Sequence, residues 1–249
     1  MATKLSVNVN KWATLRNARG GNNPDLIQTA RSLESYGAQG ITVHPRPDER
    51  HIKYQDTRDL KKVVTTEFNI EGNPIQSFVD LVLEVRPTQV TLVPDAPDAI
   101  TSNAGWDCKT HQKFLKDTIA TFKQEGIRTS IFLNADVDMV HYAAETGTDR
   151  IELYTEPYAL DFNSNREKAI EPFIATALEA KKLGIGLNAG HDLSLDNIAY
   201  FAAQVPDLLE VSIGHALICE AIENGLETVV KRYLTLLKEA QQWSYTRTF

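Results

Sequence analysis

Cysteine is almost absent from this sequence, since Cys108 and Cys219 are the only two in 249 residues. Two cysteines are too few for a framework of disulfides or for a zinc site built from cysteine thiolates. The sequence also lacks H-E-x-x-H and similar spacings of metal-ligating residues. We therefore expect no catalytic metal.

Long apolar runs and an excess of positive charge are missing as well. No window is apolar enough to cross a bilayer, and the N-terminal run M-A-T-K-L-S-V-N-V-N lacks the apolar core of a signal peptide. The net charge of −7 argues against a sequence-independent nucleic-acid binder, which usually presents a basic face. We expect a cytoplasmic protein without membrane or nucleic-acid partners. A few local arginines and lysines can still hold small anions.

The motifs of nucleotide-binding folds are also absent. The first predicted strand is followed by Gly20 and Gly21 but not by G-x-G-x-x-G, and no G-x-x-x-x-G-K-[ST] loop occurs. These absences count against an open, doubly wound sheet. No proline- or serine-rich linker, charge block or low-complexity tract divides the chain, and 42% of its residues are hydrophobic. We expect a single domain that spans residues 1–249.

What the sequence does contain is a regular alternation of short strand-like runs and amphipathic segments. The predicted strands cover residues 5–10, 39–44, 67–70, 89–93, 128–133, 150–154, 186–188 and 208–213. Each strand is followed by a helix, at roughly 25–35 residues per unit, and eight such units close into a (β/α)8 TIM barrel. We expect a loop over residues 155–164 and one helical tail over residues 216–243.

The stretch G-I-T-V-H-P-R-P-D-E-R-H, residues 40–51, joins a predicted strand to a loop that is rich in titratable residues. A β-branched run leads directly to His44, and the loop behind it carries Arg46 and His51. Arginine offers a planar fork to phosphate or carboxylate, and histidine changes its protonation near neutral pH. A buried strand that ends in such a loop is how a barrel presents chemistry, although a solvated charged loop is the alternative interpretation.

Polar and titratable residues recur at the carboxyl ends of the other predicted strands. In chain order they are Asn8 and Asn10, His44, Glu71, Asp95 and Thr101, Glu152, His191, and Gly214 with His215. In a barrel these ends share one mouth, so their recurrence predicts an active site. Each also has a simpler interpretation: His44 as a core histidine, Glu71 as a cap of the next helix, and Glu152 as half of an ion pair.

Two groups of residues predict sites for phosphate. Backbone N–H groups of Gly190 and Gly214 follow strands seven and eight, where barrels of this kind often bind phosphate. The second group comprises Arg46, His51 and Thr101, with Arg19 near the first site. Two anion sites in an acidic protein predict phosphorylated small-molecule substrates.

Four acid–base groups at one mouth favour a particular class of reaction. They are His44, Glu71, Glu152 and His191. Several proton-transfer groups without a metal cluster suit enolisation, imine formation, dehydration and ring closure better than hydrolysis. Two other hypotheses stay open: a phosphosugar isomerase or aldolase, and a phospho-ligand binding protein without catalysis.

Four long motifs resemble those of the pyridoxine 5′-phosphate synthase family. They are V-N-x-x-x-x-A-T-L-R-N-A-R-G, G-I-T-V-H-x-R-x-D-x-R-H-I, N-A-G-H-D-L and S-I-G-H-A, in this order over nearly the whole chain. The resemblance implies a barrel with extra helices that assembles as an octamer of paired barrels. It also implies condensation of 3-amino-2-oxopropyl phosphate with 1-deoxy-D-xylulose 5-phosphate, without metal or organic cofactor.

The resemblance also implies roles for individual residues. His44 and Glu71 would accept protons, His191 would donate one, and Glu152 would stabilise the transition state. The amino-ketone phosphate would bind to Asn8, Arg19, Gly214 and His215, and the deoxyxylulose phosphate to Arg46, His51 and Thr101. Residues 94–107 would form a lid that excludes water.

The sequence departs from the common family pattern at three places. Asn10 and Lys11 stand where many members have Asp-His, and we expect both to contact substrate. Asp192 replaces the glycine that usually follows the catalytic histidine, and its backbone N–H is expected to contact substrate as well. Residues 155–158 read T-E-P-Y instead of a small, glycine-containing turn. The four acid–base residues are all present.

Overall fold

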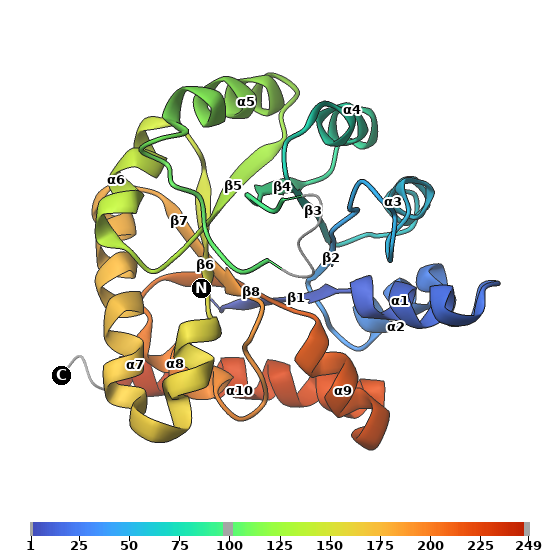
Figure 1. Ribbon diagram of the computed structural model, residues 1–249. Helices are drawn as coiled ribbons and strands as arrows, with labels where there is room; N and C mark the ends of the chain where they lie inside the picture. The colour runs from blue at the N-terminus through green and yellow to red at the C-terminus, as the bar shows by residue number, and fades with distance from the viewer. Residues whose placement is uncertain (1, 97–101, 247–249) are drawn as a thin grey trace.

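Eight parallel strands close into a barrel at the centre of the molecule (Figure 1). The computed structural model describes residues 2–96 and 102–246. The strands are β1 (Lys4–Asn8), β2 (Gly40–Val43), β3 (Glu67–Gly72), β4 (Gln89–Leu92), β5 (Arg128–Leu133), β6 (Arg150–Tyr154), β7 (Gly186–Gly190) and β8 (Leu208–Ile213). Each pairs with the next, and β8 pairs with β1, where Val7 lies opposite Ile213. The predicted (β/α)8 barrel is confirmed.

The helices form a ring around the barrel (Figure 1). They are α1 (Asn10–Arg19), α2 (Leu26–Ser35), α3 (Tyr54–Lys61), α4 (Gln76–Val85), α5 (Gln112–Gln124), α6 (Val137–Glu145), α7 (Glu156–Lys182), α8 (Ile198–Gln204), α9 (His215–Asn224) and α10 (Leu226–Thr246). Two helices follow β1 and two follow β8, so the described part of the chain has more helices than strands. None of the helices in the described residues is long and apolar enough to span a membrane.

Alternation along the strands directs apolar side chains towards the helices and polar side chains into the barrel. In β2, Ile41 and Val43 belong to the apolar core, whereas the Thr42 hydroxyl lies 2.8 Å from the Ser6 hydroxyl of β1. From β3, the Asn69 amide donates to the Thr42 hydroxyl at 3.4 Å. The main apolar core therefore lies between barrel and helices, and the groups at the barrel mouth stand on a polar interior.

Capping residues explain where two of the helices begin. The Asp25 side chain accepts hydrogen bonds from two backbone N–H groups in the first turn of α2, and Asp136 does the same for α6. These bonds satisfy N–H groups that have no partner within the helix.

The prediction of a loop over residues 155–164 was wrong, because α7 begins at Glu156 and continues to Lys182. Pro157 lies in the first turn, where it removes no helical hydrogen bond. Tyr158 is fully buried and packs edge-on against Phe173 and Phe201, which fixes this turn to the core. The helix is interrupted at Asn165, whose backbone conformation is not helical, with a φ of −160°.

Two further boundaries differ from the prediction. The single helical tail is divided at Gly225, which has a φ of +82° and separates α9 from α10. Glycine adopts this left-handed conformation without the penalty that a Cβ atom brings. Asn10, expected at the end of the first strand, is instead the first residue of α1.

Candidate active site

Glu71 lies inside strand β3, near its carboxyl end, and its side chain is buried. Its carboxylate accepts hydrogen bonds from the amides of Asn8 and Asn69, each at 3.4 Å. Burial raises the pKa of Glu71 well above its usual range, and the nearby carboxyl of Glu152 raises it further. The capping interpretation is wrong, because Ile75 is the N-cap of α4 and the helix receives no side-chain cap.

His44 directly follows β2 and lies between two carboxyl groups. Its Nδ1 is 3.9 Å from Glu71 Oε2, and its Nε2 is 3.7 Å from Asp95 Oδ2. Burial lowers the pKa of His44 well below its usual value, and the charge of Arg46 lowers it further. The imidazole is therefore neutral near pH 7 and can accept a proton, which makes these contacts polar rather than ionic.

Asn10 positions His44 through the backbone. The Asn10 side-chain oxygen accepts a hydrogen bond from the His44 backbone N–H at 2.9 Å. The Asn10 backbone N–H in turn donates to the Asn8 side-chain oxygen at 3.0 Å. The start of α1 is thereby tied to the end of β2, directly below the mouth.

Glu152 is buried within β6 and faces the barrel interior. Burial raises its pKa to about 7, against the opposing effects of His191 and of the Thr91 hydroxyl, which lies 3.5 Å from Oε2. Its Oε1 lies against Gly190, where an added Cβ atom would approach to 2.7 Å. Among the described residues Glu152 has no lysine or arginine partner in an ion pair, so the simple ion-pair interpretation is not supported.

A chain of polar groups joins the two buried carboxyls. The Thr91 hydroxyl lies 3.1 Å from the Asn69 side-chain oxygen, and the Asn69 amide donates to Glu71. Thr91 also contacts Glu152, as described above. Sequence reasoning missed Asn69 and Thr91. The available signal was the alternation of polar and apolar residues in E-F-N-I-E, which predicts that the polar side chains share one face of β3.

His191 follows β7 in a left-handed backbone conformation with a φ of +85°. Such conformations cost a residue with a side chain about 1 kcal/mol or more. The His191 backbone N–H donates to the Ser212 carbonyl at 3.2 Å, and its ring packs edge-on against Tyr154. Its Nδ1 lies 2.6 Å from Asp192 Oδ2, and about a third of the side chain is exposed. This histidine is thus open to a molecule at the mouth.

Arg46 forms a buried ion pair. Its Nη2 lies 2.6 Å from Asp95 Oδ2, the same oxygen that accepts from the Ser102 hydroxyl at 2.7 Å. A pocket beside this pair is lined by residues that include His44, Arg46, Asn73 and Asp95. Asp95 therefore holds the guanidinium in place at the mouth and also competes with any anion for it.

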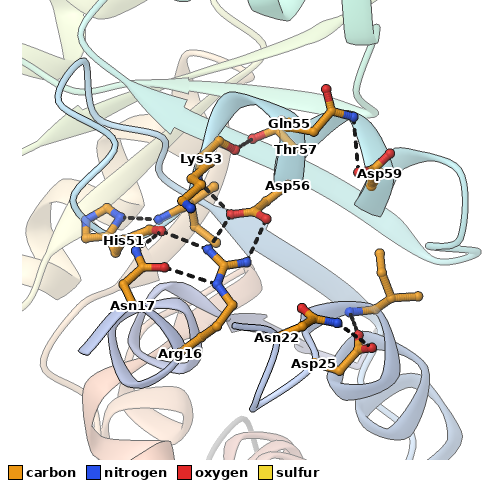
Figure 2. Close-up of polar contacts among 12 residues, drawn as sticks. Arg16, Asn17, Asn22, Asp25, His51, Lys53, Gln55, Asp56, Thr57 and Asp59 are labelled. Atoms are coloured by element: carbon orange, nitrogen blue, oxygen red, sulfur yellow. Dashed lines mark hydrogen bonds and ion pairs between the residues drawn. The ribbon is translucent and has the colours of Figure 1, made fainter. Parts of the chain in front are cut away.

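His51 lies in the loop between β2 and α3 and is held by two residues of α1, Arg16 and Asn17 (Figure 2). Arg16 donates to both carboxylate oxygens of Asp56 at 2.7 Å, and the Asn17 amide donates to the His51 carbonyl at 2.8 Å. Burial lowers the pKa of His51 to about 4, and the charges of Arg46 and Lys11 contribute. Sequence reasoning gave Arg16 no role, because its partner lies 40 residues away.

The remaining predicted ligands lie at the rim. Lys11, Arg19 and His215 are exposed, and Gly214 is the N-cap of α9. Gly214 also packs against Asn8, whose Cβ would lie 3.1 Å from a Cβ added at the glycine. Thr101 lies outside the described residues.

The predicted lid, residues 94–107, is only partly described. Its second half is attached to β5 and to the residue after it. The Trp106 backbone N–H donates to the Phe132 carbonyl at 2.9 Å, and the Gly105 N–H donates to the Asn134 side chain at 3.0 Å. A Cβ atom at Gly105 would lie 2.3 Å from the Asn134 nitrogen, so only glycine fits there. The end of the lid segment is thus anchored.

The residues that the structure describes contain no cluster of three histidines, cysteines or carboxylates arranged to hold a metal ion. The mouth instead offers a neutral imidazole, two carboxyls with raised pKa values, and a partly exposed histidine. This set can move protons between neighbouring atoms of a bound molecule. Fold and site together describe a (β/α)8 barrel with a candidate acid–base site at its mouth.

Solved structures share this barrel at low sequence identity. Phosphoribosylanthranilate isomerase from Thermotoga maritima matches with a TM-score of 0.60 and 12% identity, covering 95% of this chain and 99% of the other. Thiamine phosphate pyrophosphorylase from Pyrococcus furiosus matches with a TM-score of 0.62 and 12% identity, covering 95% and 96%. At this identity the likeness concerns the fold alone.

Sequence comparisons are far closer. The model of the family described as pyridoxal phosphate biosynthesis protein PdxJ matches residues 5–239, and the chain belongs to this family. A pyridoxine 5′-phosphate synthase from Christiangramia forsetii is 62% identical over 236 residues, which is 95% of this chain and 100% of the relative. Its counterpart from Cytophaga hutchinsonii is 61% identical over 237 residues, again 95% and 100%.

Proposed function

We propose that this chain is a pyridoxine 5′-phosphate synthase, which condenses 3-amino-2-oxopropyl phosphate with 1-deoxy-D-xylulose 5-phosphate and releases inorganic phosphate and water. The observation that carries the proposal is the full-length match to synthases of that name at about 60% identity. The reaction needs imine formation, dehydration and ring closure. Each of these steps moves protons and needs no external oxidant or reductant.

Glu71 and His44 act as the proton acceptors in this proposal. Support comes from their separation of 3.9 Å and from the low pKa of His44, which keeps its ring unprotonated near neutral pH. The raised pKa of Glu71 makes it a stronger base once it is ionised. Proton removal from the amine and from carbon is assigned to this pair.

Glu152 and His191 act on the opposite side of the mouth, on β6 and after β7. A carboxyl with a pKa of about 7 can hold or release its proton near neutral pH, which suits transition-state stabilisation by Glu152. His191 is the proton donor for the oxygen that leaves as water. Its partial exposure supports direct contact with substrate.

The two phosphates bind on different sides of the rim. The amino-ketone phosphate is assigned to Asn8, Arg19, Gly214 and His215, with Asn10 and the Asp192 backbone nearby. The deoxyxylulose phosphate is assigned to Arg46, His51, Lys11 and Thr101. The charges of Arg46 and Lys11 both act on His51, which supports a shared anion site there. The segment 94–107 closes over both substrates.

The assembly and the compartment belong to the proposal too. Leu160 on α7 and Ile222 on α9 are each 74% exposed, and a homo-octamer built from dimers would cover apolar side chains of this kind. Light scattering should then give eight copies of the 27.8 kDa chain, or about 222 kDa. We place the enzyme in the cytoplasm.

Purified protein incubated with one or both substrates tests the reaction. We expect pyridoxine 5′-phosphate only when both are present. Turnover of one phosphorylated ketone alone would favour an isomerase or aldolase. Binding of both without turnover would favour a non-catalytic binding protein, and either result would contradict the synthase.

A further inference from the structure

Two neighbouring side chains meet at the mouth. His191 Nδ1 and Asp192 Oδ2 are 2.6 Å apart, a short hydrogen bond. Successive side chains of an extended chain point to opposite faces, so such a contact requires a turn between them. The left-handed conformation of His191, with a φ of +85°, supplies this turn.

The backbone around this pair is held from two directions. The Thr155 hydroxyl donates to the Gly190 carbonyl and accepts from the Asp192 backbone N–H at 3.2 Å. The Asn197 amide donates to the Asp192 carbonyl at 3.3 Å. The Asp192 carboxylate therefore starts from a fixed backbone position, and its direction towards His191 does not depend on a flexible loop.

The chemistry of the contact fixes the tautomer of the imidazole. An ionised carboxylate can only accept hydrogen bonds, so the proton between the two residues belongs to His191 Nδ1. Exchange of a further proton with a bound molecule then has to take place at Nε2. The Tyr154 ring, edge-on at 5.5 Å between ring centres, restricts the tilt of the imidazole.

We propose that Asp192 is a positioning residue that holds His191 in one orientation with the proton of the neutral ring on Nδ1, so that Nε2 is the nitrogen that takes up a further proton and then passes it to the substrate in the condensation. This inference rests on the proposed function, in which His191 is the proton donor. The Asp192 backbone N–H, which we expected to contact substrate, instead donates to the Thr155 hydroxyl, and the carboxylate is engaged by His191.

Nitrogen-15 NMR of the full-length protein tests the proposal. The protein is labelled at its histidines and studied by magic-angle spinning, which tolerates a large assembly, at a pH where the ring is neutral. The His191 signals are assigned by their loss in His191→Asn. The test variants are Asp192→Gly, which removes the side chain, and Asp192→Asn, whose amide can also donate. Asp196→Asn removes an exposed carboxylate from the same loop and serves as the control.

We expect a proton on Nδ1 in the wild type and in the control, and its loss or mixing with the other tautomer in both Asp192 variants. Because the ring is then misoriented, kcat should fall about tenfold while each KM stays within about twofold. Thermal unfolding midpoints show whether the variants fold.

An unchanged Nδ1–H signal in Asp192→Gly would overturn the proposal. A changed tautomer with an unchanged kcat would overturn it as well, since the bond would then position nothing that matters for turnover. If the wild type forms no pyridoxine 5′-phosphate when both substrates are present, the proposed function fails. The spectra would still decide whether Asp192 fixes the tautomer.

Discussion

Thr91 lies between the two buried carboxyls, Glu71 and Glu152, at the base of the mouth. Its hydroxyl contacts Glu152 Oε2 at 3.5 Å and reaches Glu71 through the Asn69 side chain. A hydroxyl that donates to a carboxylate favours the ionised form, so Thr91 lowers the pKa of Glu152 against the effect of burial. The Thr91 hydroxyl thus helps to keep the pKa of Glu152 near neutral pH, where the carboxyl can both hold and release its proton.

Replacement of Thr91 by valine, which has nearly the same volume, removes this hydroxyl. The pKa of Glu152 should rise above about 7, and the limb of the kcat/KM profile that reports it should move to higher pH. Initial rates between pH 5.5 and 9 measure this shift. Thr121→Val, on the exposed face of α5, is the control. A limb that stays in place or moves to lower pH would contradict this role for Thr91.

The contacts of His191 show why part of the site could not be predicted from the sequence. The motif N-A-G-H-D-L predicted His191 at the mouth, because a strand end is visible as a change of pattern. Its contact with Asp192 depends on a positive φ, which no residue type there requires. The Arg46–Asp95 pair joins residues 49 positions apart, and the pairing of β2 with β3 and of β3 with β4 brings them together.

At the scale of elements, α1 is fastened to the first turn of α3 by the ion pair between Arg16 and Asp56. Both side chains are largely buried, and the bidentate pair also directs Arg16 towards the His51 carbonyl at 3.3 Å. Loss of one partner from such a pair leaves the other charge without compensation. This pair therefore sets the place of His51 at the rim.

Asp56→Asn should lower the free energy of unfolding by about 2–4 kcal/mol. It should also raise KM for the deoxyxylulose phosphate more than KM for the amino-ketone, because His51 is assigned to the deoxyxylulose phosphate site alone. Urea unfolding and steady-state kinetics measure both effects. Asp59→Asn, which breaks an exposed pair with Lys62 in the same helix, should cost under about 1 kcal/mol. Equal losses of unfolding free energy and equal changes in KM for Asp56→Asn and Asp59→Asn would contradict this role of Asp56.

Strand prediction succeeded where the local pattern was sufficient. The strands predicted at 128–133, 150–154 and 208–213 match β5, β6 and β8 to the residue, because β-branched and aromatic runs are bounded there by turn residues. The first turns of α7 were missed because asparagine and serine near Asn165 indicate a loop. Burial of Tyr158 against the core outweighs that local preference.

At the scale of the whole molecule, the barrel encloses charged groups below the active site. Glu67 on β3 pairs with Arg128 and Arg150, and Asn188 links Arg150 to Glu210 on β8. Burial raises the pKa of Glu210 to about 7, although Arg150 opposes the shift. The folded protein therefore binds a proton between pH 4.5 and 7 that the unfolded chain does not bind, so stability falls as pH rises through this window.

Glu210→Gln should remove this contribution. Between pH 5 and 8 the fall in the free energy of unfolding should be about 2–3 kcal/mol smaller in this variant than in the wild type. Urea unfolding at pH 5, 6.5 and 8 gives both curves, and Glu223→Gln on the surface of α9 controls for a change of net charge. If the unfolding free energy depends on pH in the same way in wild type and Glu210→Gln, then Glu210 has the same pKa in the folded and unfolded states, which would contradict this prediction.

The single domain over residues 1–249 and the octamer stay predictions of the sequence, whereas barrel closure is confirmed. Closure could be predicted because eight repeats of strand and helix leave few other topologies. The polar interior could not, since alternation within one strand does not say which face points inward until all eight strands are placed.

The most direct test of the account is the rate at which Glu71→Gln forms pyridoxine 5′-phosphate from both substrates, compared with wild type and with Glu84→Gln on the surface. Glutamine keeps the size of the side chain but cannot take up a proton. We expect kcat to fall by at least about 10²-fold with little change in either KM, and the surface variant to match the wild type. A Glu71→Gln rate within threefold of the wild type would show that another group is the base.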